Sequence, residues 1–145
     1  MCHQSGLPFT IVRPHNLYGP RMGQVHVLPE LIKKACVLPI GGFLEVASVD
    51  HRRAFCFIDD AVEMLRRLAS EAKGVNGTFN IGNQDQEVSI EQVANVVLGA
   101  IGRPDLKVVA LPSTPGSPAR RCPEFFPRVH SPSLRVPSNR IAPDT

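Results

Sequence analysis

The sequence lacks several features that would define a class of function at once. It has no apolar run approaching the ~18 to 20 residues that a membrane-spanning helix needs, and its N-terminus lacks the basic start and apolar run of a signal peptide. Its four cysteines form no C-x-x-C pair and have no histidine at zinc-like spacing. We therefore expect a cytoplasmic protein that binds neither a membrane nor a metal ion, with Cys36 and Cys56 as buried free thiols.

Charge of one sign is also scarce over most of the chain. The formal net charge is +3, but residues 1–111 hold equal numbers of basic and acidic side chains, so the excess lies in residues 112–145. There is no basic face with interleaved aromatic residues, which argues against a nucleic-acid partner.

Two parts of the chain differ in composition. Residues 1–111 alternate short apolar strands with amphipathic helices, which predicts an α/β fold. Residues 112–145 hold eight of the 14 prolines, which leaves no room for a normal helix or a central strand. We expect this second part to be extended or disordered unless a ligand or the rest of the chain holds it, and residues 125–145 to be disordered.

The spacing of apolar residues and helix caps predicts the elements of the first part. Ser89 and Gln92 form a capping box at the start of one helix, and Gly102 ends it. Asp59 or Asp60 is expected to cap another. The predicted strands cover residues 9–12, 44–48, 54–58, 78–81 and 106–111, and the predicted helices cover 26–36, 59–72 and 90–101.

The most informative run is Arg13-Pro14-His15-Asn16-Leu17-Tyr18-Gly19-Pro20-Arg21, directly after the first predicted strand. It places polar side chains at the carboxyl end of a strand, where open α/β sheets bind ligands. The Asn16 carboxamide can donate to phosphate or sugar oxygens and accept from hydroxyls; the alternative is that it only shapes the turn before Tyr18. The run resembles a signature of the extended short-chain dehydrogenase/reductase family of sugar-nucleotide epimerases, dehydratases and decarboxylases.

Four further segments resemble that family in the family's own order, so that the resemblance covers roughly residues 1–124. In one of these segments, Arg53 is followed by an aromatic-rich strand and an Asp pair, and Ala54 stands where the family has Asp. The four segments are His26-Val27-Leu28-Pro29, the run from Arg53 to Asp60, Thr78-Phe79-Asn80-Ile81-Gly82-Asn83, and the stretch from Gly116 to Glu124.

The resemblance implies a set of ligand-binding residues. It implies that Arg53 forks onto the diphosphate of a sugar nucleotide, a planar contact that lysine cannot copy, with Arg52 as the alternative. The implied substrate-binding residues are Asn16, His26, Val27, Arg53, Asn80, Arg121 and Glu124, and Pro14 and His15 are implied to lie beside the nicotinamide of NAD. Plainer alternatives are a surface role for His26, a backbone contact for Asn80, and a charged patch for residues 116–124.

The family's catalytic and NAD-binding signatures are missing from this sequence. It contains no G-x-x-G-x-x-G, and its only tyrosine, Tyr18, has no lysine at the fourth position after it. The resemblance therefore implies the C-terminal, substrate-binding half of a Rossmann-type, NAD-dependent, UDP-glucose 4-epimerase-like enzyme that binds a UDP-sugar, in a family that is usually homodimeric. We expect no catalytic residue and no turnover by this chain alone. The alternative is a non-catalytic sugar-nucleotide-binding module, or the non-functional product of a truncated gene.

Overall fold

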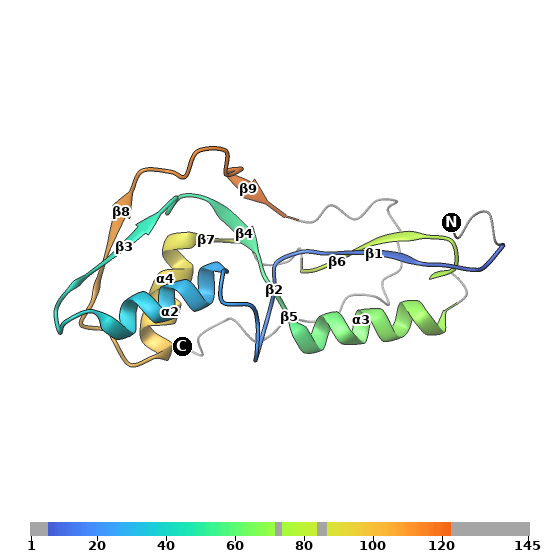
Figure 1. The fold of residues 1–145 in the computed structure, drawn as a ribbon, viewed down its shortest axis with the longest axis horizontal. Helices are drawn as coiled ribbons and strands as arrows, with labels where there is room; N and C mark the ends of the chain where they lie inside the picture. The colour runs from blue at the N-terminus through green and yellow to red at the C-terminus, as the bar shows by residue number, and fades with distance from the viewer. Residues whose placement is uncertain (1–5, 72–73, 84–86, 123–145) are drawn as a thin grey trace. The chain divides into compact units, whose positions relative to one another are not determined.

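The computed structural model describes residues 6–71, 74–83 and 87–122, and it has the expected α/β character (Figure 1). The chain divides into two compact units. Among the described residues, unit 1 contains 6–19, 54–71, 74–83 and Cys122, and unit 2 contains 20–53 and 87–121. Over these ranges no helix is long and apolar enough to cross a membrane, and no group of three or more His, Cys, Asp or Glu is placed to hold a metal ion.

Unit 1 is built from two pairs of parallel strands and one helix. Strand β1 (Ile11–Pro14) pairs with β6 (Thr78–Ile81), and β2 (Leu17–Tyr18) pairs with β5 (Cys56–Phe57). Helix α3 (Ile58–Ser70) follows β5 directly. The core of unit 1 consists of Cys56, Ala61, Leu68 and Ile81, with Val12, Leu17, Met64 and Phe79 packed against them.

The start of α3 differs from the prediction. Its N-cap is Phe57, whose side chain cannot cap, and Asp59 and Asp60 lie inside the first turn. The prediction of an aspartate cap was therefore wrong. Carboxylates in the first turn still suit the positive end of the helix dipole, so the Asp pair does mark a helix start.

Gly19, in the Tyr-Gly-Pro part of the first motif, is required by close packing against α3. A Cβ atom at this position would lie 2.5 Å from Cγ2 of Ile58, the first residue of the helix. Tyr18, just before it, packs edge-on against Phe55 and Phe57, with ring centroids 6.3 and 5.3 Å away. The motif thus joins β2 to the start of α3 through packing.

Unit 2 contains two helices packed against a parallel strand pair, and a three-stranded sheet. Helices α2 (Val27–Val37) and α4 (Ile90–Ala100) contact each other and strand β3 (Phe43–Ala47), which pairs in parallel with β8 (Lys107–Leu111). The sheet has the order β7 (Glu87–Ser89), β4 (Arg52–Ala54) and β9 (Arg120–Arg121). The buried apolar residues of the two helices and of β3 are Leu31, Ala35, Leu44, Val46, Ile90, Val93, Ala94, Val97 and Leu98.

Helix α4 confirms the predicted capping box. The backbone N–H of Gln92 donates to Oγ of Ser89 at 3.1 Å, and the backbone N–H of Ser89 donates to Oε1 of Gln92 at 2.8 Å. Gly102, at φ +70°, lies just beyond the C-cap Ile101, as the sequence predicts.

The two cysteines in apolar segments behave differently. Cys56 is buried in the core of unit 1, where burial and then the charge of Asp60 raise the pKa of its thiol to about 11. Cys36 is exposed, so the prediction of burial was wrong there. The buried face of α2 carries Leu31 and Ala35, and the residue after Ala35 points away from that face.

Arg103, which lies after α4, binds backbone carbonyl groups at the C-terminal end of α2. Its guanidinium donates to the carbonyl oxygens of Ala35, Leu38 and Pro39 at 2.7, 3.1 and 3.1 Å. Its Nε also lies 2.9 Å from Oδ1 of Asp105, and this contact lowers the pKa of that carboxyl to about 2. Arg103 therefore binds one carbonyl in the last turn of α2 and the carbonyls of the two residues that follow the helix.

We expect Arg103→Ala to lower the melting temperature by roughly 5 °C or more, because three carbonyl groups lose a charged donor at once. Thermal unfolding followed by circular dichroism measures this shift. Arg66→Ala is the matched control: Arg66 forms an exposed ion pair with Glu63 on α3, and such pairs contribute little. Equal shifts for the two variants would contradict the role given to Arg103.

Candidate functional site

Four arginines meet where strands β4 and β9 pair in parallel. Arg52 lies opposite Arg120, and Arg53 lies opposite Arg121. Because successive side chains of a strand point to opposite faces, the register sorts the four into two pairs. We call Arg52 and Arg120 the first pair, and Arg53 and Arg121 the second pair.

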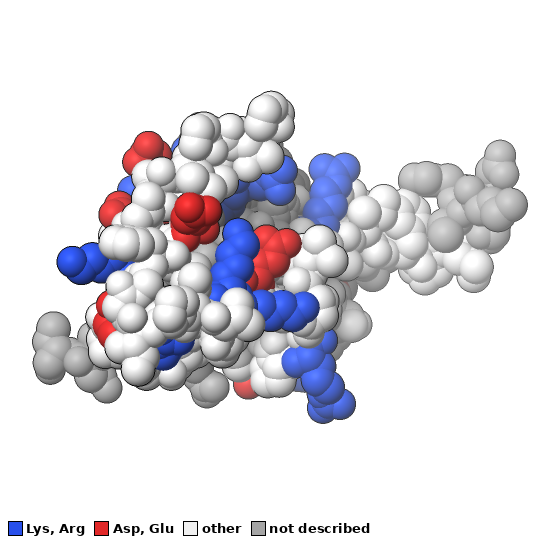
Figure 2. Space-filling model, turned by 60° about the vertical axis from the view of Figure 1, so that its left-hand side comes forward, with Lys and Arg blue, Asp and Glu red and all other residues white. Residues whose placement is uncertain are grey.

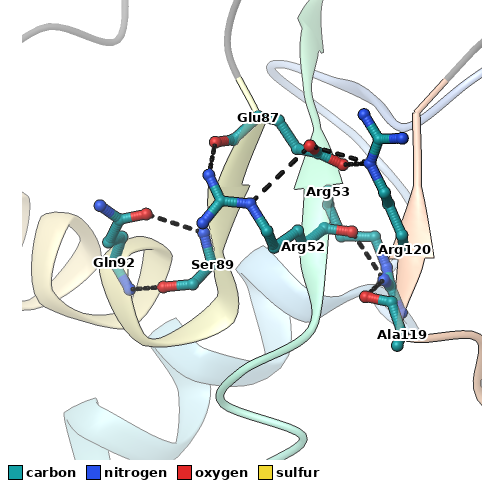
Figure 3. Close-up of polar contacts among 7 residues, drawn as sticks. All are labelled: Arg52, Arg53, Glu87, Ser89, Gln92, Ala119 and Arg120. Atoms are coloured by element: carbon teal, nitrogen blue, oxygen red, sulfur yellow. Dashed lines mark hydrogen bonds and ion pairs between the residues drawn. The ribbon is translucent and has the colours of Figure 1, made fainter.

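The first pair shares one carboxylate partner, Glu87 of β7 (Figure 3). Nε of Arg120 donates to Oε1 of Glu87 at 2.8 Å, and Nε of Arg52 lies 3.7 Å from Oε2 of the same carboxylate. Nη2 of Arg52 also donates to the backbone oxygen of Glu87 at 2.6 Å. One carboxylate thus serves two guanidinium groups and joins all three strands of the sheet.

The second pair has no such partner. Nη1 of Arg53 donates to the backbone oxygens of Arg52 and Ala119 at 2.8 and 3.3 Å (Figure 3), and Nη2 donates to Oγ of Ser117 at 3.2 Å. All of these acceptors are uncharged. Within the part of the chain that the structure describes, no carboxylate lies within ion-pair distance of Arg53 or Arg121.

The electrostatics of Arg53 reflect this lack of a counter-charge. Burial and then the positive charge of Arg121 lower its pKa from the ordinary value. Acidic and basic side chains are interspersed on the face shown in Figure 2. Two arginines without a carboxylate form a site that attracts an anion, and the guanidinium fork matches phosphate oxygens.

His51 completes the surroundings of Arg53. It lies two residues before Arg53, its side chain is buried, and its Nδ1 is 3.5 Å from Nη2 of Arg53 and 3.3 Å from Oγ of Ser117. The sequence prediction missed both His51 and Ser117. The i, i+2 spacing of His51 and Arg53 was a usable signal, because it places both side chains on one side of an extended segment. Ser117 lies in the stretch from Gly116 to Glu124 that the resemblance covers, but no role was predicted for it.

The residues of the first motif form a turn in unit 1 between β1 and β2. Pro14 ends β1, and the backbone N–H of His15 donates to the carbonyl of Ile81 at 2.8 Å. Asn16 has the left-handed φ of 43°, its Nδ2 donates to the carbonyl of Ala54 at 2.9 Å, and its own carbonyl accepts from Cys56 at 3.2 Å. The Asn16 side chain thus stabilises this turn through one N–H group of its carboxamide.

The remaining predicted site residues lie in both units or outside the described residues. Asn80 is half-buried in β6, in register with Arg13 of β1. His26 is the exposed N-cap of α2 without a side-chain capping bond, and Val27 is the first residue of that helix. Glu124 lies outside the described residues. Of all the predicted residues, Arg53 and Arg121 are paired directly by strand register.

Comparison with known proteins decides the family. The model of the NAD dependent epimerase/dehydratase family matches residues 1–82. The chain belongs to this family.

Relatives and solved structures agree with this assignment. UDP-D-apiose/UDP-D-xylose synthase 1 of Arabidopsis thaliana is 33% identical over 106 residues, which cover 65% of this chain and 27% of the relative. UDP-glucuronic acid decarboxylase 6 of the same plant is 33% identical over 125 residues, covering 84% and 34%. The chain thus spans about a third or less of these relatives.

Among solved structures, UDP-glucuronic acid 4-epimerase from Bacillus cereus, in complex with UDP-glucuronic acid and NAD, matches with a TM-score of 0.70 at 22% identity. The match covers 86% of this chain and 38% of that one. At this identity the likeness shows the fold, and it confirms the predicted Rossmann-type α/β class.

Two of the predicted residues lie where an α/β sheet presents groups to a ligand. Pro14 and the half-buried His15 lie at the carboxyl end of β1, a position at which α/β sheets present groups to a ligand. The glycine-rich turn that would hold the diphosphate of a dinucleotide is not present in the sequence. We therefore derive no chemical step through the cofactor.

Proposed function

We propose that this chain is the sugar-nucleotide-binding part of an NAD-dependent epimerase or decarboxylase that acts on a UDP-sugar. The relatives are named for UDP-sugar substrates, and the second arginine pair provides the anion-binding chemistry that a nucleoside diphosphate needs. In this proposal Arg53 binds the diphosphate, and Arg121 adds a second positive charge. The cytoplasmic location and a homodimeric assembly stay predictions.

The observation that carries the proposal is that, among the described residues, the first arginine pair has a carboxylate partner and the second pair has none. Four arginines lie in register on two short strands, and the pair on one face shares the carboxylate of Glu87. Within the described residues the other pair lacks a carboxylate partner, and burial and the charge of Arg121 both disfavour the charged form of Arg53. A bound phosphate anion would offset both effects, and it explains why the second pair is retained without a carboxylate.

The other residues that the resemblance singles out are proposed to contact ligands from within their own units. In unit 1, Asn16 and Asn80 offer carboxamides to a sugar nucleotide. Pro14 and His15 are proposed to contact the nicotinamide of NAD, which supplies hydride transfer when it is bound. In unit 2, His26 and Val27 at the start of α2 are proposed to cover the nucleotide. Glu124 is proposed to accept from ribose hydroxyls.

The proposal predicts that the 145-residue chain binds UDP-sugars on its own. Isothermal titration calorimetry with UDP-glucose and UDP-glucuronic acid is expected to give measurable heat. UMP is expected to bind at least about 10-fold more weakly, because it lacks the second phosphate that Arg53 and Arg121 would share. Circular dichroism of the same sample establishes that it is folded. A folded chain that gives no heat with any nucleoside diphosphate would contradict the proposal.

A further inference from the structure

We infer that His51 is a positioning residue for Arg53: its Nδ1 is the acceptor that holds the guanidinium ready for a diphosphate. This inference rests on the proposed function and adds to it a residue that does not itself touch the ligand. The argument depends on the direction of the hydrogen bonds around His51 and on how firmly its backbone is held.

One arrangement of donors and acceptors makes all three contacts around Nη2 of Arg53 hydrogen bonds, and it is the one that we infer. Arginine has no acceptor, so Arg53 donates to Oγ of Ser117 at 3.2 Å and toward Nδ1 of His51 at 3.5 Å. The Ser117 hydroxyl then has its own proton left, which it donates to Nδ1 of His51 at 3.3 Å. In this arrangement Nδ1 accepts from both neighbours and the ring proton lies on Nε2.

The backbone of His51 fixes this acceptor in place. Its N–H donates to the carbonyl of Ser48 at 2.9 Å, and its carbonyl accepts from the N–H of Ile90, the first residue of α4, at 3.0 Å. The residue is only 7% exposed. A buried ring held at both backbone groups has little freedom, so Nδ1 is a rigid reference point for a long and otherwise flexible side chain.

A fixed acceptor matters because arginine loses rotamer freedom when it binds a ligand. An arginine that moves freely before binding loses this conformational entropy when the ligand binds. An arginine that is already held loses less, so its ligand binds more tightly. The same contact involves Ser117, which lies four residues before Arg121 in the sequence. His51 therefore links Arg53 to the segment that leads to the other arginine of the pair.

Two variants of His51 in the full chain separate acceptor chemistry from packing. In His51→Asn the Oδ1 atom is attached to Cγ, as Nδ1 is in histidine, and can accept from Arg53 and Ser117. In His51→Leu the side chain has a similar size but no acceptor. We expect the dissociation constant for UDP-glucose, measured by calorimetry, to rise about 10-fold in His51→Leu and less than about 3-fold in His51→Asn.

A double-mutant cycle tests whether the effect passes through Arg53. In the Arg53→Ala background, His51→Leu is expected to change the dissociation constant by less than about 2-fold, since there is no guanidinium left to position. An equal loss in both backgrounds would overturn the inference, as would tighter binding or unchanged binding by His51→Leu. The proposed function would survive each of these results. If the wild-type chain itself bound no UDP-glucose, the proposed function would fail, and this role with it.

A measurement without ligand checks the contact directly. In nitrogen-15 NMR spectra, the Nη groups of Arg53 are expected to rotate slowly and give separate signals in the wild-type chain and in His51→Asn. In His51→Leu they are expected to average, because one acceptor on Nη2 is lost. Identical Arg53 signals in His51→Leu and the wild type would overturn the positioning role.

Discussion

Replacing Arg53 by alanine is expected to weaken the binding of UDP-glucose about 100-fold, or about 2.7 kcal/mol at 25 °C. The variant removes the guanidinium that the strand register places beside Arg121 without a carboxylate. It also leaves the diphosphate beside a single arginine. Arg53→Lys keeps the charge but loses the planar fork, and we expect its affinity to lie between those of the wild type and Arg53→Ala. Calorimetry with UDP-glucose measures all three.

The matched control comes from the neighbouring face of the same two strands. Arg120→Ala removes an arginine next to Arg121, but one that is bound to Glu87. We expect its dissociation constant for UDP-glucose to stay within about 2-fold of the wild type. If Arg120→Ala and Arg53→Ala lost affinity equally, the binding would depend on total positive charge rather than on the second pair, and our assignment would be wrong.

Leu44→Ala is expected to cost unit 2 about 2 to 5 kcal/mol of unfolding free energy. Leu44 is fully buried in β3, which both helices of the unit contact. Truncation removes apolar contacts and leaves a cavity that a strand packed against two helices cannot easily close. Urea denaturation followed by circular dichroism gives the change. This is a large share of the stability of a domain, which is about 5 to 15 kcal/mol.

Leu111→Ala is the control for this prediction, since it makes the same change at the exposed end of β8. Leu111 is 39% exposed, so we expect its truncation to cost less than about 1 kcal/mol. Similar losses in the two variants would show that burial in β3 does not dominate the stability of unit 2.

The predictions that succeeded rest on local chemistry. The capping box of α4 and the spacing of its apolar residues involve neighbours within a few turns, and the structure confirms both. The aspartate cap of α3 was wrong because Phe57 ends its strand directly at the helix, so the Asp pair lies inside the first turn. Cys36 was placed wrongly because apolar neighbours in sequence do not decide which face of a helix a residue occupies.

The site was predictable only in part, for a related reason. The resemblance pointed to Arg53 and Arg121, and strand register pairs them. The roles of Glu87 and Ser117 depend on contacts across 33 and 64 residues of sequence. Parallel pairing brings such residues together without leaving a local pattern. The sequence therefore indicated which arginines are important, but not which of the four arginines share a carboxylate.

The parallel register of β4 and β9 also limits how this region can vary. If β9 slid by one residue along β4, each of its arginines would exchange faces, and Glu87 would then face a different partner. Insertions between β8 and Ser117 would leave the strand pairing unchanged, because a connecting segment can lengthen without moving the strands. A single residue inserted or deleted within Arg120–Arg121 would instead move an arginine from the face of Glu87 to the face of Arg53, or the reverse. The loop can thus change in length, whereas in β9 only an insertion or deletion of two residues would keep each arginine on its present face.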